Sequence, residues 1–156
     1  MLITIVAVGK KEPDWINQGV GEYTKRLSGD VKVKLIEVSA VKRGKTDSID
    51  VALQKEARKI SSVIPRGSPY FVLDEHGKQF STVDLAEKLD QWINEGISPC
   101  LIIGGADGLH ESIKSGAMGS WSLSKLTLPH GLARVLLAEQ AYRAWTILKN
   151  HPYHRK

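Results

Sequence analysis

Short apolar runs alternate along this chain with longer segments in which apolar residues recur every three or four positions. The short runs are rich in β-branched residues, which predicts strands over residues 2–8, 33–38, 70–73 and 100–103. The longer segments have the apolar spacing of helices and lie over residues 13–27, 47–63, 81–96 and 109–115. Strands that alternate with helices predict an α/β fold with a parallel sheet covered on both faces.

Local signals support several of these boundaries. Pro13 stands in the first turn of its helix, where the missing N–H costs nothing. Ser81 followed by Asp84 is typical of a helix start, because the serine oxygen accepts a backbone N–H. Gly96 is typical of the position just after a helix end. We therefore expect Pro13, Ser81 and Gly96 to mark helix termini.

Paired glycines interrupt the chain directly after the fourth predicted strand. Gly104 and Gly105 let backbone groups meet a ligand without side chains between them. A second apolar turn follows at residues 123–130, beside a possible fifth strand at 121–126 and before a final helix from about 131 to 150. Because ligands of parallel sheets bind at the carboxyl ends of strands, the glycines and the turn predict a cofactor pocket.

Polar residues are set into this apolar final helix. Glu139 precedes Arg143 by four positions, the favourable order for an ion pair, and we interpret the pair as structural. Arg134 and Arg143 have the alternative role of contacting phosphate or a target base. Tyr142 and Trp145 are interpreted as packing residues.

Composition predicts one globular domain of 156 residues, with 42% apolar and 25% charged residues. The apolar opening segment is too short to span a membrane and has no basic segment before it, so we expect a cytoplasmic protein without a membrane anchor. The single cysteine, Cys100, excludes an internal disulfide and a cysteine-based zinc site, and its apolar strand predicts a core position. The net charge of +5, with basic residues gathered at 42–45 and at the C-terminus, is a mild bias toward nucleic acid.

The glycine segment lacks the two commonest phosphate-binding motifs. A P-loop needs a lysine and a hydroxyl residue at the helix start, and residues 104–109 have neither. A dinucleotide fold needs three spaced glycines after its first strand, where this chain has Gly9 alone. The pocket therefore suits a ligand bound through adenine and ribose.

Four segments, in their order and spacing, resemble the RlmH family, knotted methyltransferases of the SPOUT superfamily. They are Ile103-Gly104-Gly105 with Gly108, the turn at residues 123–130, the helical segment 139–144 and the terminal Tyr153-His154-Arg155. The likeness covers the whole chain. It implies an α/β, parallel-sheet SPOUT fold in a single domain, residues 1–156, with a C-terminal trefoil knot that ordinary folds avoid.

The resemblance also implies the activity and its partners. Family members use S-adenosyl-L-methionine, without a metal, to methylate N3 of a pseudouridine in the 23S rRNA of assembled ribosomes, and they are homodimers. The cofactor-binding residues implied for this chain are Leu73, Gly104, Leu123, Ser124, Lys125, Leu126, Thr127 and Leu128. Lys125 is expected to face solvent and to contribute backbone contacts.

The C-terminal tail is the implied catalytic segment. Tyr153 has a ring that can stack on a base, and Arg155 has a cation for phosphate or a uracil carbonyl. The N3 proton must leave, and His154 is the leading candidate for the base because its unperturbed pKa is suitable. Arg155 or Arg143 would stabilise the negative charge. The choice among these residues stays open at this point.

Other interpretations also stay open. His130 either begins or caps the final helix or lines the pocket mouth, and Gly131 beside it is expected to tolerate variation. The alternative functions are a SPOUT methyltransferase for transfer RNA or another ribosomal site, a non-enzymatic ribosome-associated factor, and a generic basic RNA-binding module.

Overall fold

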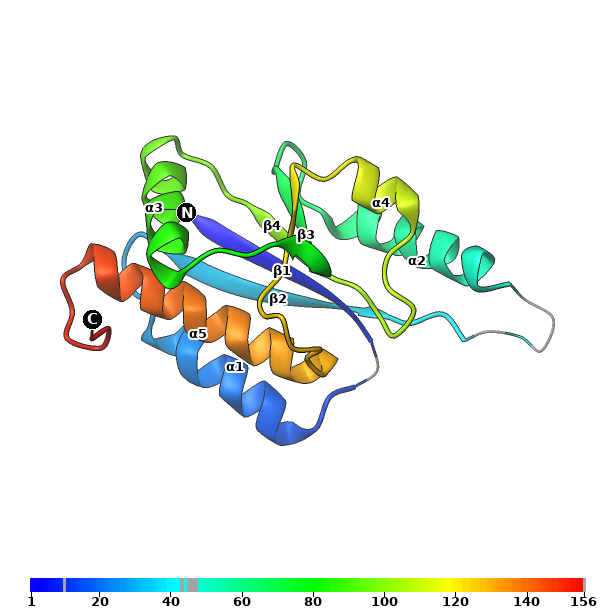
Figure 1. Ribbon diagram of the computed structural model, residues 1–156, viewed down its shortest axis with the longest axis horizontal. Helices are drawn as coiled ribbons and strands as arrows, with labels where there is room; N and C mark the ends of the chain where they lie inside the picture. The colour runs from blue at the N-terminus through cyan, green and yellow to red at the C-terminus, as the bar shows by residue number, and fades with distance from the viewer. Residues whose placement is uncertain (10, 43, 45–47, 156) are drawn as a thin grey trace.

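A computed structural model describes residues 1–9, 11–42, 44 and 48–155, in which strands and helices alternate (Figure 1). The strands are β1 Leu2–Gly9, β2 Lys32–Ser39, β3 Tyr70–Lys78, β4 Cys100–Ile103 and β5 Gly119–Trp121. The helices are α1 Asp14–Arg26, α2 Ile49–Val63, α3 Thr82–Asn94, α4 Glu111–Ser115 and α5 His130–Leu148. Four residues of the expected basic clusters and second helix, Arg43, Lys45, Asp47 and Lys156, lie outside the described residues.

The strands form one parallel sheet in the order β2-β1-β4-β3-β5. Helices α1, α3 and α5 lie on one face of this sheet, and α2 and α4 lie on the other (Figure 1). The expected α/β fold with a parallel sheet covered on both faces is confirmed.

The two central strands, β1 and β4, are apolar without alternation because both of their faces are covered. Ile3, Ile5 and Ala7 of β1 pack toward α1, α3 and α5. Val6 and Val8 pack toward α2 and α4. Cys100 of β4 is fully buried, which confirms its core position, and burial raises the pKa of its thiol to about 12.

Helix α5 lies between α1 and α3 and packs against both (Figure 1). Apolar residues surround its axis on all sides, which is typical of a helix enclosed by its neighbours. Tyr142 is buried, and Trp145 is half-buried against the same core, so their interpretation as packing residues is confirmed. Even the polar Thr146 has no exposed surface.

The predicted fifth strand over 121–126 is wrong in its extent. Strand β5 ends at Trp121, and the following residues form a loop. The Ser122 hydroxyl donates to the Ser124 carbonyl over 2.8 Å, and the Ser124 hydroxyl accepts the Leu126 N–H over 2.9 Å. Side-chain bonds of this kind compete with a strand ladder for backbone groups, so the chain turns instead of extending.

Helix termini agree better with the predictions. Ser81 and Asp84 form a reciprocal capping box at the start of α3. Gly96 follows the end of α3 with φ of +66°, and Pro13 precedes the first residue of α1.

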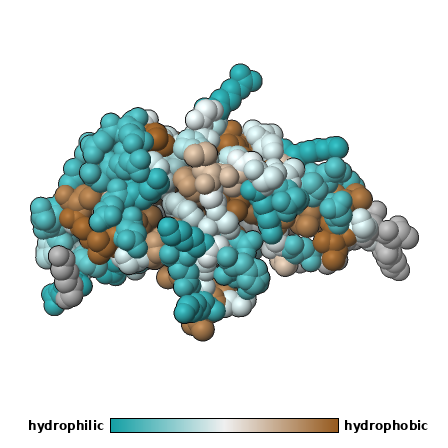
Figure 2. Space-filling model, turned by 45° about the horizontal axis from the view of Figure 1, so that its top comes forward, coloured by the Kyte–Doolittle hydropathy of each residue, from teal (hydrophilic) through white to brown (hydrophobic). Residues whose placement is uncertain are grey.

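No helix among the described residues combines the length and apolarity needed to cross a bilayer. On the face shown in Figure 2, polar residues predominate and apolar residues form separate patches.

Candidate functional site

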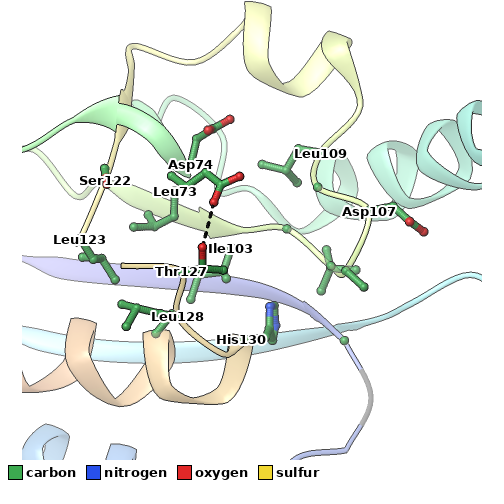
Figure 3. A pocket seen from close by; sticks show the side chains of 18 of the residues that line it. Leu73, Asp74, Ile103, Asp107, Leu109, Ser122, Leu123, Thr127, Leu128 and His130 are labelled. Atoms are coloured by element: carbon green, nitrogen blue, oxygen red, sulfur yellow. Dashed lines mark hydrogen bonds between the residues drawn. The ribbon is translucent and has the colours of Figure 1, made fainter. Parts of the chain in front are cut away.

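A cavity of about 960 Å³ opens at the carboxyl ends of β1, β3 and β4, where parallel sheets place their ligands (Figure 3). One wall is the glycine segment after β4, residues 104–109. The opposite wall is the loop at residues 122–128, and His130 closes one end of the cavity from the start of α5. The apolar side chains that face this space include Leu73, Ile103, Leu123 and Leu128.

The glycine wall is a tight turn that requires glycine at two positions, Gly104 and Gly108. Gly108 has φ of +82°, and its N–H donates to the Gly105 carbonyl over 3.0 Å. A Cβ on Gly104 would lie 2.8 Å from the Gly108 carbonyl oxygen and from Leu109 Cγ. Gly104 is therefore needed for the turn to fold back on itself, in addition to any contact it makes with a ligand.

The loop wall is held by its own side chains and by β3. The hydrogen bonds of Ser122 and Ser124 close its first turn. The Thr127 hydroxyl donates to Glu75 Oε2 over 3.4 Å, which ties the loop to the end of β3 (Figure 3). Leu126 is 73% exposed and forms the outer edge of the wall.

Carboxylates outnumber ammonium groups around the cavity. The acidic lining residues are Glu12, Asp74, Glu75 and Asp107, against the single lysine Lys114. The His76 backbone N–H, 2.9 Å from Asp74, holds the pKa of that carboxyl below its usual range, and Lys114 at 3.3 Å adds to the effect. Lys114 and Arg134 pair with two of these carboxylates, Asp74 and Glu12, and the negative charge that remains favours a ligand that carries positive charge. In the described part of the chain, no three His, Cys, Asp or Glu side chains converge as a metal site would require.

His130 and Arg134 form a buried polar link behind the cavity. His130 Nε2 lies 3.2 Å from Arg134 Nη2. Arg134 is 1% exposed and pairs with Glu37 at 2.5 Å and with Glu12 at 3.6 Å. This corrects the alternative in which Arg134 contacts phosphate or a base, because its guanidinium is enclosed and already paired. His130 is the first residue of α5 and also lines the cavity, so both of its interpretations hold.

The structure brings most of the expected cofactor residues together. The residues that line the cavity are Leu73, Gly104, Leu123, Ser124, Leu126, Thr127 and Leu128. Lys125 does not line it and faces solvent, as expected for its side chain. Leu73 also packs against the core below the cavity. Contact of these residues with a cofactor stays a prediction.

The C-terminal tail lies away from the cavity of its own chain. Helix α5 has 19 residues, which separates the tail from His130 by about 27 Å (Figure 1). Tyr153 folds back on this helix: its hydroxyl donates to Glu139 over 3.1 Å, and its ring meets that of Tyr142 at 4.8 Å. Burial is the main cause that raises the pKa of Tyr153 to about 12. Neither His154 nor Arg155 lines the cavity.

The expected ion pair on α5 is confirmed. Glu139 Oε1 lies 2.5 Å from Arg143 Nη2 and accepts from Arg143 Nε over 2.8 Å. Arg143 also lies over the ring of Tyr153, 4.7 Å from its centroid. The pair therefore anchors the folded-back tail.

Sequence reasoning missed several residues of this site. The sequence predicted no role for Glu12, Glu37 or Asp74. Asp74 directly follows the predicted strand at residues 70–73. His130 and Arg134 are four residues apart on one helix, and this spacing could have predicted their contact. Gly131, which we expected to vary, is tightly packed: a Cβ there would lie 2.7 Å from a Glu12 carboxylate oxygen.

Comparison with known proteins agrees with this architecture. A family model described as "Predicted SPOUT methyltransferase" matches residues 1–154. This chain belongs to the SPOUT methyltransferases, and within them to the RlmH family. A protein of Hydrogenovibrio crunogenus named ribosomal RNA large subunit methyltransferase H is 47% identical over 156 residues, which is 100% of both chains. A protein of the same name from a Janthinobacterium species is 48% identical over 155 residues, 99% of both chains. The RlmH resemblance and the SPOUT fold are confirmed.

Proposed function

We propose that this RlmH-family protein is an S-adenosyl-L-methionine-dependent methyltransferase that modifies N3 of a pseudouridine in the 23S rRNA of assembled ribosomes. One observation carries the proposal: the cavity between the glycine turn and the loop at 122–128 is present in a chain whose full-length relatives are named as large-subunit rRNA methyltransferases.

The cavity fits the cofactor in size and in chemistry. Its volume of about 960 Å³ is at the upper end of the range usual for small-molecule sites, roughly 300–1,000 Å³. Leu73, Leu123 and Leu128 offer an apolar surface for adenine. The excess of carboxylates suits the positive sulfonium and ammonium groups. No phosphate has to be bound, which agrees with the absence of phosphate-binding motifs from the sequence.

When bound, S-adenosyl-L-methionine supplies an activated methyl group, so the protein has to align the acceptor and remove its proton. His154 is the proposed base for the N3 proton. In this chain its Nδ1 is enclosed and has no hydrogen-bond partner among the described residues. Arg155 or Arg143 stabilises the charge left on the ring carbonyls, and Tyr153 stacks on the base.

A homodimer is part of the proposal, because the tail lies about 27 Å along α5 from the cavity of the same chain. A symmetric dimer would place the tail of one protomer at the cavity of its partner without unfolding α5. We also propose that the chain forms the trefoil knot of the family and acts in the cytoplasm, where assembled ribosomes are found. We further propose that the dimer surface contacts the ribosome.

The test is methyl transfer to ribosomes that lack this modification. The protein is incubated with S-adenosyl-L-methionine and either assembled ribosomes or free large subunits, and the digested RNA is analysed by mass spectrometry. We expect methylpseudouridine with assembled ribosomes only. Methyl transfer to transfer RNA or to another ribosomal site would show that the protein is a methyltransferase with a different substrate from the one proposed. Ribosome binding without cofactor binding would favour the non-enzymatic factor instead.

A further inference from the structure

Glu12 is the least exposed carboxylate of the cavity. Its side chain is 17% exposed, against 22% for Asp74 and 58% for Glu75, and Asp107 is exposed as well. A carboxylate that is less screened by water interacts more strongly with a charged ligand. Among the acidic residues that line the cavity, Glu12 is therefore best placed to bind a cation.

The protein neutralises the charge of Glu12 only in part. Arg134 Nη2 lies 3.6 Å from Glu12 Oε1, which is an ion pair beyond hydrogen-bond distance. The same guanidinium donates to Glu37 Oε1 over 2.5 Å. Two carboxylates thus share one cation, and the closer partner, Glu37, does not line the cavity. The negative charge that is left over therefore belongs to the carboxylate at the cavity wall.

Glu12 is also held in one place. A Cβ on Gly131 would lie 2.7 Å from Glu12 Oε2, so this oxygen packs against the first turn of α5, where the glycine leaves room for it. Arg134 of the same helix contacts the other oxygen. A charged group that is already fixed loses little conformational freedom when a ligand binds, which favours affinity.

The proposed cofactor carries two positive groups, a sulfonium and the ammonium of its methionine part. Methyl transfer removes the charge of the sulfonium, so a fixed carboxylate against it would stabilise the bound cofactor more than the transition state. The ammonium keeps its charge throughout the reaction. A carboxylate that pairs with the ammonium therefore strengthens binding without slowing methyl transfer.

We propose that Glu12, held by Arg134, is a cofactor-binding residue that receives the ammonium of the methionine part. The inference rests on the proposed function, because it takes S-adenosyl-L-methionine as the ligand. Glu12 comes from the segment between β1 and α1, whereas the leucines proposed for adenine come from β3 and the loop at 122–128. Different elements would thus bind the two ends of the ligand.

The experiment measures the affinities of wild type, Glu12→Gln and Glu37→Gln for three ligands by calorimetric titration at one neutral pH. S-adenosyl-L-methionine has both cations, S-adenosyl-L-homocysteine has only the ammonium, and 5′-methylthioadenosine has neither. We expect Glu12→Gln to bind the first two about tenfold more weakly and 5′-methylthioadenosine within about twofold of wild type. Glu37→Gln is the matched control: it removes the closer partner of Arg134 outside the cavity, so any change should be equal for all three ligands.

The pattern among the three ligands separates binding of the ammonium from other roles of Glu12. Equal weakening for all three in Glu12→Gln, or no weakening, would overturn the inference, because the carboxylate would then act on the whole cavity or not at all. Loss with S-adenosyl-L-methionine alone would place Glu12 at the sulfonium and would also overturn it. Tighter binding of S-adenosyl-L-homocysteine would do the same, because the carboxylate of the ligand would then lie beside Glu12. If the wild type binds none of the three ligands, the proposed function is refuted, and this inference with it.

Discussion

Gly77 connects the packing of the sheet to the shape of the cavity. A Cβ at this position would lie 2.6 Å from the backbone N and C atoms of Trp121. Strands β3 and β5 pair at this point, and the loop that begins after Trp121 forms a wall of the cavity. Backbone atoms cannot rotate away as a side chain can, so a larger residue must displace β5 and the loop together.

We predict that Gly77→Ala lowers the free energy of unfolding by about 1–3 kcal/mol. Gly21→Ala is the matched control, because Gly21 lies inside α1 with nothing among the described residues within 4 Å of the added Cβ. Alanine should stabilise that helix by roughly 0.5–1 kcal/mol. Thermal unfolding of both variants measures the difference, and equal melting temperatures would contradict the close contact at Gly77.

The rate at which a reagent labels the Cys100 thiol should measure how often the core opens. It has no exposed surface, and burial raises the pKa of its thiol to about 12, so the reactive thiolate is scarce near neutral pH. We predict that a thiol reagent labels the native protein slowly and the protein in denaturant at once. Because Cys100 is the only cysteine, one absorbance trace measures the reaction. Rapid labelling of the native protein would place the thiol at the surface.

At the scale of elements, the loop at 122–128 owes its shape to two serine side chains rather than to a strand ladder. We predict that Ser124→Ala weakens S-adenosyl-L-methionine binding about fivefold, since it leaves the Leu126 N–H without its acceptor. Ser28→Ala, at an exposed position outside the cavity, is the control. Calorimetric titration measures the affinity. An unchanged affinity together with an unchanged melting temperature would show that the loop keeps its shape by other contacts.

The elements differ in how far their sequences predict them. Strands β1 and β4 are buried on both faces, so their apolar runs are unbroken and their bounds were predicted closely. Ser81 and Gly96 act within their own helix end and were also predicted. Strand β5 was misjudged because its ladder with β3 ends where Ser122 and Ser124 turn the chain. Apolar residues in a strand and in a cavity wall look alike in a sequence.

At the scale of the whole molecule, the cavity and the tail lie at opposite ends of α5. We predict that a cavity-filling variant, Leu128→Trp, and a tail variant, His154→Ala, are each inactive alone. When the two proteins are mixed and allowed to exchange protomers, part of the methyltransferase activity should return, because the mixed dimer contains one intact cavity and one intact tail that meet. The activity that returns is measured as transfer of labelled methyl groups to ribosomes. If no activity returns although mixed dimers form, the tail and the cavity of the same protomer must serve each other.

The sequence by itself determined the alternation of strands and helices, the buried central strands, the glycine turn and the family, because each is encoded in short patterns or in their order. Only the tertiary structure decided which distant residues meet. Arg134 pairs with Glu12 and Glu37 because α5 packs on the face of the sheet and brings its first turns to the segments near β1 and β2, and the same packing places His130 beside Arg134. Local propensity acts over a few residues, whereas these contacts depend on how whole elements pack, which no single segment encodes.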